Sequence, residues 1–295
     1  MNFSTSQPKV IVIGSCSIDQ IVTAERLPKP NEFVSAQKSE FFFGGKGANQ
    51  AVGMSRLGGH VYFIGCVGMD PAGQQIMRNL VQENVNAGFV TETDIETTGS
   101  AFITKTENDY SVVFIPAANQ CLTAQSIDAA DKYIRESDMV LMQLEISEEL
   151  LKHAVLKAKL HHKTVGIYAS PGRKIDQIVL DQTDFIIARS NELPLIFGSE
   201  NLESILKKYA NKLFVRDETN ATVYHNGAEM KYQREENETM KYQIGTGDAF
   251  TCGFAYAFAQ GNDLEDCVNL GNKVSAKVSV KTGAQTGLPY LKDLL

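Results

Sequence analysis

Short apolar runs alternate with segments of helical periodicity along most of the chain, and this alternation constrains the fold more than any other feature. The apolar runs are residues 10–13, 61–67, 139–144, 164–168, 185–188 and 213–215. The helical patterns are residues 48–57, 72–83, 126–135, 148–161 and 202–209. Continuous apolar runs are typical of parallel strands that are buried on both faces. The sequence therefore predicts an α/β fold, a doubly wound parallel sheet with helices on both faces.

Two stretches, residues 18–43 and 101–115, interrupt the alternation. The first holds two extended segments around the Pro-Lys-Pro-Asn sequence at residues 28–31, and the second reads as a hairpin with its loop at residues 107–109. Both are predicted to form a small β-layer that stands off the core. A further hairpin is predicted at residues 222–232, where Asn226-Gly227 indicates a type I′ turn. No linker separates independent domains, so residues 1–295 are expected to form one unit.

Composition narrows the classes of partner. The chain has 295 residues, 43% of them hydrophobic, and a formal net charge of −7. That acidic balance argues against nucleic acid or an anionic membrane as a partner. Five scattered cysteines without a Cys-x-x-Cys pattern indicate reduced thiols rather than disulfides. With neither a signal peptide nor a membrane-spanning run in the sequence, a cytoplasmic protein is expected.

The segment GGKGANQA at residues 44–51 opens a predicted helix. Glycines allow a backbone to approach a ligand closely, and a helix N-terminus offers free N–H groups. Lys46 and Asn49 add hydrogen-bond donors suited to sugar hydroxyls. A Walker loop is excluded because Gly47 follows the lysine where Ser or Thr is required. From the residues alone, a tight glycine turn before a packed helix remains the alternative.

A second glycine-rich turn, GTGD at residues 245–248, precedes an apolar helix expected over residues 249–259. Successive N–H groups there would form an anion hole with the helix dipole behind it. The carboxylate of Asp248 could accept a hydroxyl proton as a phosphoryl group arrives. An aspartate that merely caps the helix is the alternative.

Taken together, these two motifs resemble the ribokinase (PfkB) family of sugar and nucleoside kinases, and the resemblance extends over essentially the whole chain. Supporting segments are Gly14-Ser15 with Asp19, MQLE at residues 142–145 and KTGAQ at residues 281–285. The resemblance implies a ribokinase-like core with a small β-sheet lid, formed by about residues 18–43 and 101–115. It also implies transfer of the γ-phosphoryl group of ATP to the 5-hydroxyl of D-ribose.

The same resemblance assigns roles to individual residues. Asp248 is implied as the catalytic base, with Gly245, Thr246 and Gly247 as the anion hole. The implied sugar-binding residues are Ser17, Asp19, Gly45, Lys46, Gly47, Asn49 and Glu145. Ser17 replaces the family's Asn, which shortens one sugar contact.

On the nucleotide side, the resemblance implies ATP with Mg²⁺. The implied ATP-binding residues are Asn191, Arg216, Thr219, Gly247 and Asn272. Several departures from the family pattern fall here. Pro194 replaces the acid of the Asn-x-x-Glu motif, Asp217 and Glu218 bring negative charge, and Tyr242-Gln243 replaces an Asp-Thr pair that helps to hold a monovalent cation. These departures argue against potassium activation, and the sequence does not identify the metal ligands.

Three functions therefore remain open. The first is a ribose kinase, the second a non-catalytic sugar-binding or regulatory protein with the same fold, and the third a kinase of another furanose or of a nucleoside. The intact Asp248 and anion hole favour an enzyme over the second function. Through the family resemblance alone, Lys46 in the glycine segment favours ribose over the third. Because unpaired strands invite association, a homodimer is expected to form through the lid.

Overall fold

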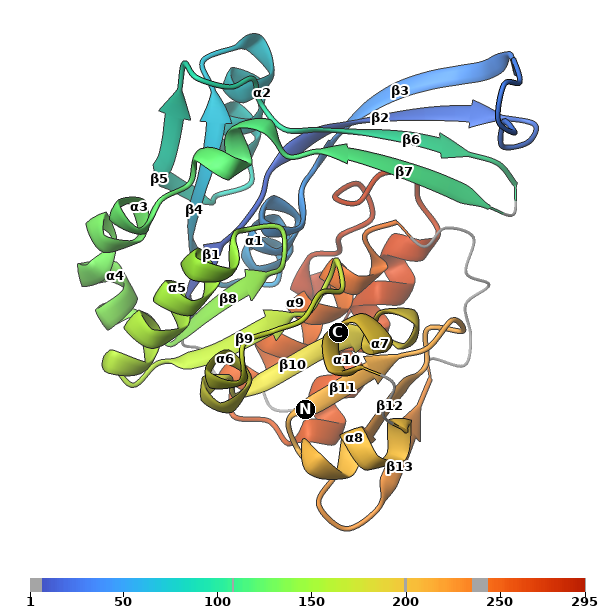
Figure 1. Cartoon of the computed structure of the whole chain (residues 1–295). Helices are drawn as coiled ribbons and strands as arrows, with labels where there is room; N and C mark the ends of the chain where they lie inside the picture. Colours follow the sequence, from blue (N-terminus) through green and yellow to red (C-terminus); the bar gives the residue numbers. More distant parts are fainter. Residues whose placement is uncertain (1–6, 108, 199–200, 235–243, 295) are drawn as a thin grey trace.

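The computed structural model describes residues 7–107, 109–198, 201–234 and 244–294, and its centre is a nine-stranded sheet (Figure 1). In spatial order the strands are β13 (Met230–Gln233), β12 (Thr222–His225), β11 (Leu213–Arg216), β10 (Phe185–Arg189), β9 (Thr164–Tyr168), β8 (Met139–Gln143), β1 (Lys9–Ile13), β4 (His60–Gly68) and β5 (Asn86–Thr93). All neighbours from β11 to β5 are parallel, while β12 and β13 are antiparallel additions. The predicted parallel core is confirmed.

Helices cover both faces of this sheet, as the alternation predicts. One face carries α1 (Lys46–Arg56), α2 (Pro71–Gln82), α9 (Thr246–Ala259) and α10 (Leu264–Ser279). The other carries α3 (Ala124–Ala129), α4 (Asp131–Glu136), α5 (Glu148–Leu160), α6 (Gln177–Gln182), α7 (Leu193–Phe197) and α8 (Leu202–Lys208). Along β1, Val10 and Val12 pack into the first core, whereas Ile11 and Ile13 pack into the second. Because strand side chains alternate between faces, a strand that is buried on both sides must be apolar throughout.

A separate four-stranded sheet stands off the main sheet at the upper right of Figure 1. Its order is β3 (Ala36–Gly44), β2 (Ser17–Ala24), β6 (Ser100–Lys105) and β7 (Tyr110–Ile115). The two stretches without helical pattern therefore pair with each other, through parallel β2 and β6. This confirms the predicted small β-layer. Residue 108, within the predicted loop of the second hairpin, lies outside the described residues.

Some local predictions are wrong in detail. The single helix expected at residues 126–135 is two helices, α3 and α4, which meet at Ala130. The hairpin of β12 and β13 exists, but its turn spans four residues, because His225 pairs with Met230. Gly227 has φ 92°, whereas Asn226 is not left-handed, as a type I′ turn would require. The side chain of Asn226 instead accepts hydrogen bonds from the Ala228 and Glu229 amides.

The order of the strands locates the functional region. β4 and β5 extend the sheet on one side of β1, whereas β8 and the strands after it extend the sheet on the other. In open α/β sheets, ligands bind beyond the carboxyl ends of the strands at such a switch point. Three 3₁₀ turns, Ala117–Cys121, Ser190–Glu192 and Leu291–Asp293, complete the described elements. Within the described residues, no helix has the length and apolar character that crossing a membrane requires.

Candidate active site

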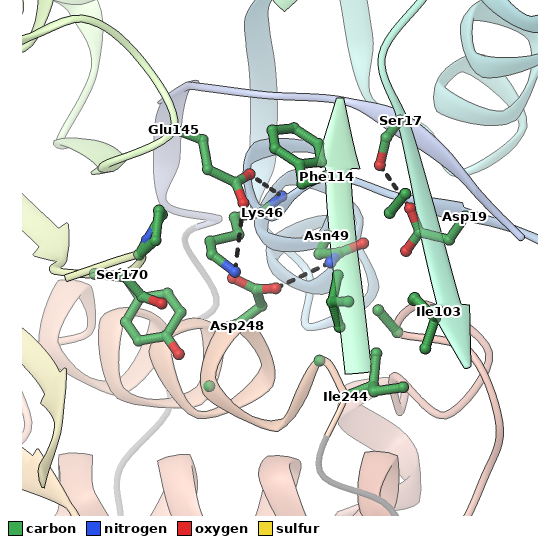
Figure 2. A pocket seen from close by; sticks show the side chains of 18 of the residues that line it. Ser17, Asp19, Lys46, Asn49, Ile103, Phe114, Glu145, Ser170, Ile244 and Asp248 are labelled. Atoms are coloured by element: carbon green, nitrogen blue, oxygen red, sulfur yellow. Dashed lines mark hydrogen bonds and ion pairs between the residues drawn. The ribbon is translucent and has the colours of Figure 1, made fainter. Parts of the chain in front are cut away.

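A cavity of about 320 Å³ lies between the small sheet and the carboxyl ends of the main strands (Figure 2). The small sheet contributes Ser17, Asp19, Ala101, Ile103, Tyr110, Val112 and Phe114. The rest of the chain contributes Gly45, Lys46, Asn49, Glu145, Tyr168, Ser170, Pro171, Arg189, Glu192, Ile244, Gly245, Gly247, Asp248 and Ala284. Nearly all the residues implied as sugar-binding or catalytic therefore line one cavity. Gly47 and Thr246 are not among the described lining residues.

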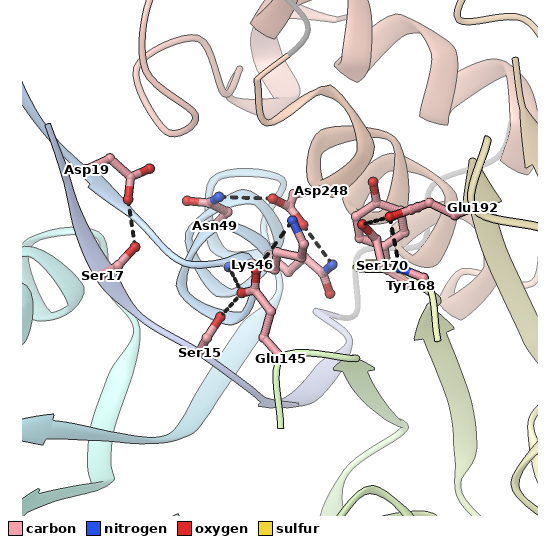
Figure 3. Close-up of polar contacts among 12 residues, drawn as sticks. Ser15, Ser17, Asp19, Lys46, Asn49, Glu145, Tyr168, Ser170, Glu192 and Asp248 are labelled. Carbon is pink, nitrogen blue, oxygen red and sulfur yellow. Dashed lines mark hydrogen bonds and ion pairs between the residues drawn. The ribbon is translucent and has the colours of Figure 1, made fainter. Parts of the chain in front are cut away.

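Lys46 and Glu145 form an ion pair at the floor of the cavity. Glu145 follows β8, and its carboxylate accepts hydrogen bonds from the Ser15 hydroxyl and from the Lys46 amide at 3.2 Å (Figure 3). The Lys46 ammonium lies 3.5 Å from the Glu145 carboxylate. Burial alone would lower the pKa of Lys46, but the charges of Glu145 and Asp248 raise it above its usual value. Lys46 is therefore a fixed cation between two acids.

Asp19 presents a second buried carboxylate from the small sheet. Its Oδ1 accepts a hydrogen bond of 2.7 Å from the Ser17 hydroxyl. Gly44 on β3, which pairs in register with Ser17, leaves the space that the Asp19 side chain fills, because a Cβ on Gly44 would lie 2.1 Å from Asp19 Oδ2. Burial raises the pKa of Asp19 to about 6, although the bond from Ser17 opposes the shift. Ser17 thus orients an acid of the cavity.

Asp248 lies in the first turn of α9 and is almost fully buried. One carboxylate oxygen accepts a 2.9 Å hydrogen bond from Asn49 Nδ2, and the other accepts a 3.1 Å bond from Gln50 Nε2. Burial raises its pKa to about 6, against the opposing effects of Lys46 and Asn49. A carboxylate with a pKa near the working pH can accept a proton in a reaction and release it afterwards.

A chain of side-chain amides supports Asp248 from behind. The Oδ1 of Asn49 accepts from Gln285 Nε2 at 3.1 Å, and the Oε1 of Gln285 accepts from Asn79 Nδ2 at 3.0 Å. On the other side, the Oε1 of Gln50 accepts from Gln143 Nε2 at 2.7 Å. Sequence reasoning assigned no role to these three glutamines, although each stands in a segment that carries the family resemblance. Their contacts join residues about one to two hundred positions apart, so the sequence offered no other signal.

The glycine turn at residues 245–247 lies at the N-terminus of α9. Gly245 is left-handed, with φ 79°, and it precedes the first turn, in which N–H groups lack intrahelical acceptors. At Gly247 a Cβ would lie 2.0 Å from the Tyr168 hydroxyl, so glycine permits Tyr168 to approach this turn. Thr246 is buried, and its carbonyl accepts a 2.9 Å bond from Arg216.

The residues implied as ATP-binding do not line a single cavity in the described part of the chain. A second cavity, of about 40 Å³, is lined by Arg189, Ser190, Asn191, Arg216, Asp217, Glu218 and Asn220. Arg216 is buried against the Phe250 ring and donates to the Thr246 and Asn220 carbonyls. Burial lowers its pKa to about 9, so it remains charged at neutral pH. Arg216 therefore supports the glycine turn as well as lining this cavity.

Two other residues implied for ATP line neither cavity in the described part of the chain. The Thr219 amide and hydroxyl both donate to Asp217 Oδ1, at 2.8 Å and 2.7 Å. Asn272 is buried, accepts from the Thr222 hydroxyl at 3.0 Å and donates to the Gln233 carbonyl at 3.3 Å. Their polar groups hold local structure. Tyr242 and Gln243, on which the potassium prediction depends, lie outside the described residues.

Glu192 is a cavity residue that sequence reasoning did not select. Its Oε1 accepts from the Ser170 hydroxyl at 2.8 Å and from the Gly172 amide at 3.0 Å (Figure 3). Its Oε2 is buried without a hydrogen-bond partner among the described residues. Pro194, at the position where the family pattern has an acid, is exposed in α7. Across the described ranges, no group of three or more His, Cys, Asp or Glu could hold a metal ion by itself.

Comparisons with known proteins agree with this geometry. A sequence profile described as pfkB family carbohydrate kinase matches residues 7–291. The chain is 32% identical over 290 residues to a ribokinase of Bacillus subtilis, which covers 97% of each chain. It is 33% identical over 291 residues to a ribokinase of Lactococcus lactis, which covers 97% of this chain and 95% of the relative. The structure of Arabidopsis thaliana ribokinase complexed with ribose and ATP superposes with a TM-score of 0.84 at 24% identity, over 98% of both chains.

The buried carboxyl of Asp19 predicts a stability that falls as the pH rises. Folding raises its pKa from 3.8 to about 6, so from about pH 4 to about pH 6 the folded chain holds a proton that the unfolded chain has lost. The free energy of unfolding therefore decreases through that window. We expect Asp19→Asn to raise the free energy of unfolding at about pH 7.5 by up to about 3 kcal/mol, the equivalent of roughly two pKa units.

Urea unfolding at about pH 4 and about pH 7.5 measures this effect, which should be much smaller at the lower pH. Asp94→Asn, at an exposed position, is the matched control. An equal change in stability at both pH values would contradict the prediction.

Proposed function

The chain belongs to the pfkB family of carbohydrate kinases, and from this premise we propose that it is an ATP-dependent ribokinase that phosphorylates the 5-hydroxyl of D-ribose. Two curated ribokinases that match nearly the full chain at 32% and 33% identity support this choice of sugar. The observation that carries the proposal is the buried Asp248, held by two amide donors in a cavity that also contains Asp19, Lys46 and Glu145.

The polar groups of the cavity suit a small polyhydroxylated ligand. The carboxylates of Asp19 and Glu145 can each accept bonds from two hydroxyls, and Lys46 can donate to others. Ile103 and Phe114, on the face of the small sheet that lines the cavity, add an apolar wall. A pentose enclosed in this way would be oriented by its hydroxyls, and water would be excluded from the reacting atoms.

Asp248 acts in this proposal as the general base. The sugar hydroxyl oxygen attacks the γ-phosphorus as its proton passes to the Asp248 carboxylate. The bond between the γ-phosphorus and the bridging oxygen breaks, and ADP leaves with that electron pair. The amides of residues 245–247 at the N-terminus of α9 stabilise the charge that develops on the phosphoryl oxygens.

Magnesium would enter with the nucleotide. Mg²⁺ is usually held by one or two carboxylates together with substrate phosphates. The Oε2 of Glu192, buried without a partner among the described residues, is an oxygen suited to the ion or to its bound water. The ion would neutralise charge on the triphosphate, while Glu192 itself is held in place by Ser170 and Gly172.

We further propose that residues 1–295 act as one kinase unit in which the small sheet is the lid. Two contacts link this sheet to the segment after α10. Lys105 donates to the Thr282 hydroxyl at 3.2 Å, and Phe42 packs on Gly283, where a Cβ would lie 2.4 Å from its ring. A cytoplasmic location is supported by the five cysteines, all of which are free thiols.

A second function is favoured by one observation, the acidic character of the nucleotide side. Asp217 and Glu218 line the smaller cavity, and Pro194 offers no ligand to a metal ion. A chain that binds ribose but no longer turns over ATP would be a sugar sensor.

The role of Asp248 predicts the behaviour of Asp248→Asn. We expect kcat to fall by at least ~100-fold, the usual scale for the loss of a general base, while the KM for ribose changes less. In the wild type, kcat/KM should rise with pH through about 6, as Asp248 ionises. Asp19→Asn is the contrasting variant, because its main effect should be on the KM for ribose. A coupled assay for ADP measures these constants, and near-wild-type turnover by Asp248→Asn would refute the role.

Ligand-induced stabilisation separates the kinase from the sensor. A ligand that binds only the folded state stabilises it by about 2.7 kcal/mol at a hundredfold excess over Kd. We expect millimolar ribose to raise the melting temperature clearly, and Mg-ATP alone to raise it less. Ribose binding without turnover at any ATP concentration would support the sensor and contradict the kinase.

The outer face of the small sheet predicts a homodimer. Register places Phe41, Gln20, Phe102 and Val113 in one row across this face. Phe41 and Val113 are 68% and 63% exposed, and Phe102 is 48% exposed. An apolar strip of this kind is typical of an interface. We expect the wild type to be a dimer and Phe102→Glu to be a monomer by light scattering.

The control for the dimer prediction is Tyr232→Glu, at an aromatic side chain that is 60% exposed on edge strand β13. That variant should remain dimeric. A wild type that is monomeric at all concentrations would contradict the dimer.

A further inference from the structure

The two cavities share one residue among their described lining residues, Arg189. It is the last residue of β10 and pairs in register with Arg216, the last residue of β11. The larger cavity contains the proposed base, and the smaller contains Asn191 and Arg216. Arg189 therefore borders both cavities.

The two neighbouring arginines are used differently. Arg216 is buried, and its guanidinium lies over Phe250 and donates to two backbone carbonyls. Arg189 is only partly buried, and its Nε donates to the Tyr168 hydroxyl at 3.2 Å. A second hydrogen bond joins it to Tyr110, on β7 of the small sheet. The Tyr168 and Tyr110 hydroxyls hold the pKa of Arg189 above its usual value, against the opposing effect of burial.

Tyr168 connects Arg189 to the glycine turn. Its hydroxyl, which accepts from Arg189, lies at the point where Gly247 has no side chain. The guanidinium is therefore anchored one side chain away from the turn at the start of α9. A planar fork of N–H donors at this place suits phosphoryl oxygens, which it can contact at two points.

The acidic side chains of the two cavities explain why a triphosphate would need a cation such as Arg189 beside it. Asp19, Glu145, Glu192 and Asp248 line the larger cavity, and Asp217 and Glu218 line the smaller. Lys46, the other cation of the larger cavity, is paired with Glu145. Arg216, the other cation of the smaller cavity, donates to the Thr246 and Asn220 carbonyls. An incoming triphosphate would therefore meet mostly negative charge unless Arg189 faced it.

We propose that Arg189 contacts the phosphoryl group during its transfer, and that Tyr168 and Tyr110 hold the guanidinium in the position that this contact requires. The inference rests on the proposed kinase function. Arg189 makes hydrogen bonds to the oxygens that gain charge as the bond to ADP breaks, and it neither gains nor loses a proton. Because Tyr110 belongs to the small sheet, the placement of Arg189 depends on where that sheet lies.

Nucleotide binding and turnover of Arg189→Gln test the proposal. We expect the Kd for ATP to rise at least ~10-fold while the Kd for ADP changes less than ~3-fold, because only ATP carries the group that is transferred. We expect kcat to fall ~100- to 1000-fold, the scale for the loss of one group that stabilises a transition state, with little change in the KM for ribose. Arg189→Lys keeps the positive charge but loses the planar pair of N–H donors. Its Kd for ATP and its kcat should lie between those of the wild type and those of Arg189→Gln.

Two further variants sharpen the test. Arg78→Gln removes the same charge from an exposed position on α2 and should behave as the wild type does. Tyr110→Phe keeps the arginine but removes its contact on the small sheet, and should lower kcat by ~3- to 10-fold with the Kd for ADP unchanged. Ribose-induced stabilisation shows that each variant is folded. If Arg189→Gln does not fold, Arg189→Lys is the variant that decides.

The inference would be overturned if Arg189→Gln kept both the wild-type ratio of ATP to ADP affinity and the wild-type kcat. If Arg189→Gln does not fold, the same result in Arg189→Lys would overturn it. Equal weakening of ATP and ADP would also overturn it, since the contact would then be with the nucleotide as a whole. If the wild type fails to phosphorylate ribose, the proposed function fails, whereas the ATP and ADP affinities still decide the role of Arg189.

Discussion

The burial of the Asp248 carboxylate is the constraint on which much of this structure depends. A carboxylate removed from water is costly unless hydrogen bonds replace its hydration. Since a carboxylate only accepts, Asn49 and Gln50 must both turn their NH₂ groups toward it. Their own carbonyl oxygens then need donors, which Gln285 and Gln143 supply. One buried acid thus fixes the orientation of several amides and ties α1, α9, β8 and the segment after α10 together.

The ion pair of Lys46 and Glu145 complements this arrangement with charge. Lys46 begins α1 and precedes Asn49, the first of the two amides that hold Asp248, by three residues. Glu145 follows β8, two residues after Gln143. The same two elements therefore supply both the amide donors and the charged pair. Lys46 also favours the ionised form of Asp248, so removing it would raise the pKa of the acid further. In the proposed reaction, sugar binding by Lys46 and Glu145 and proton transfer to Asp248 would therefore depend on the same set of charges.

The sequence predicted those elements of the fold that depend on the pattern of residues close together in the chain. β1 was predictable because its residues are apolar on both faces, and the small sheet because residues 18–43 and 101–115 lack helical periodicity. β5 was missed because it is mostly exposed and shows no continuous apolar run. α10 was missed because Asn, Lys and Ser interrupt its apolar positions, although Asp263 caps its first turn. Gln50, Gln143 and Arg189 owe their places to strand and helix neighbours that are distant in the sequence.

The contacts of Asp217 in the fold differ from what its position in the sequence suggests. In the sequence, Asp217 looks like a charge that repels phosphate. In the fold, its Oδ1 accepts bonds from the Thr219 amide, the Thr219 hydroxyl and the Ala221 amide, so the carboxylate closes its own loop. Hydrogen bonds from three donors disperse its charge, and Arg216 lies beside it. Arg216 donates to the Thr246 carbonyl and to the Asn220 carbonyl. One buried cation therefore joins the turn that is proposed to receive the phosphoryl group to the loop at residues 217–221.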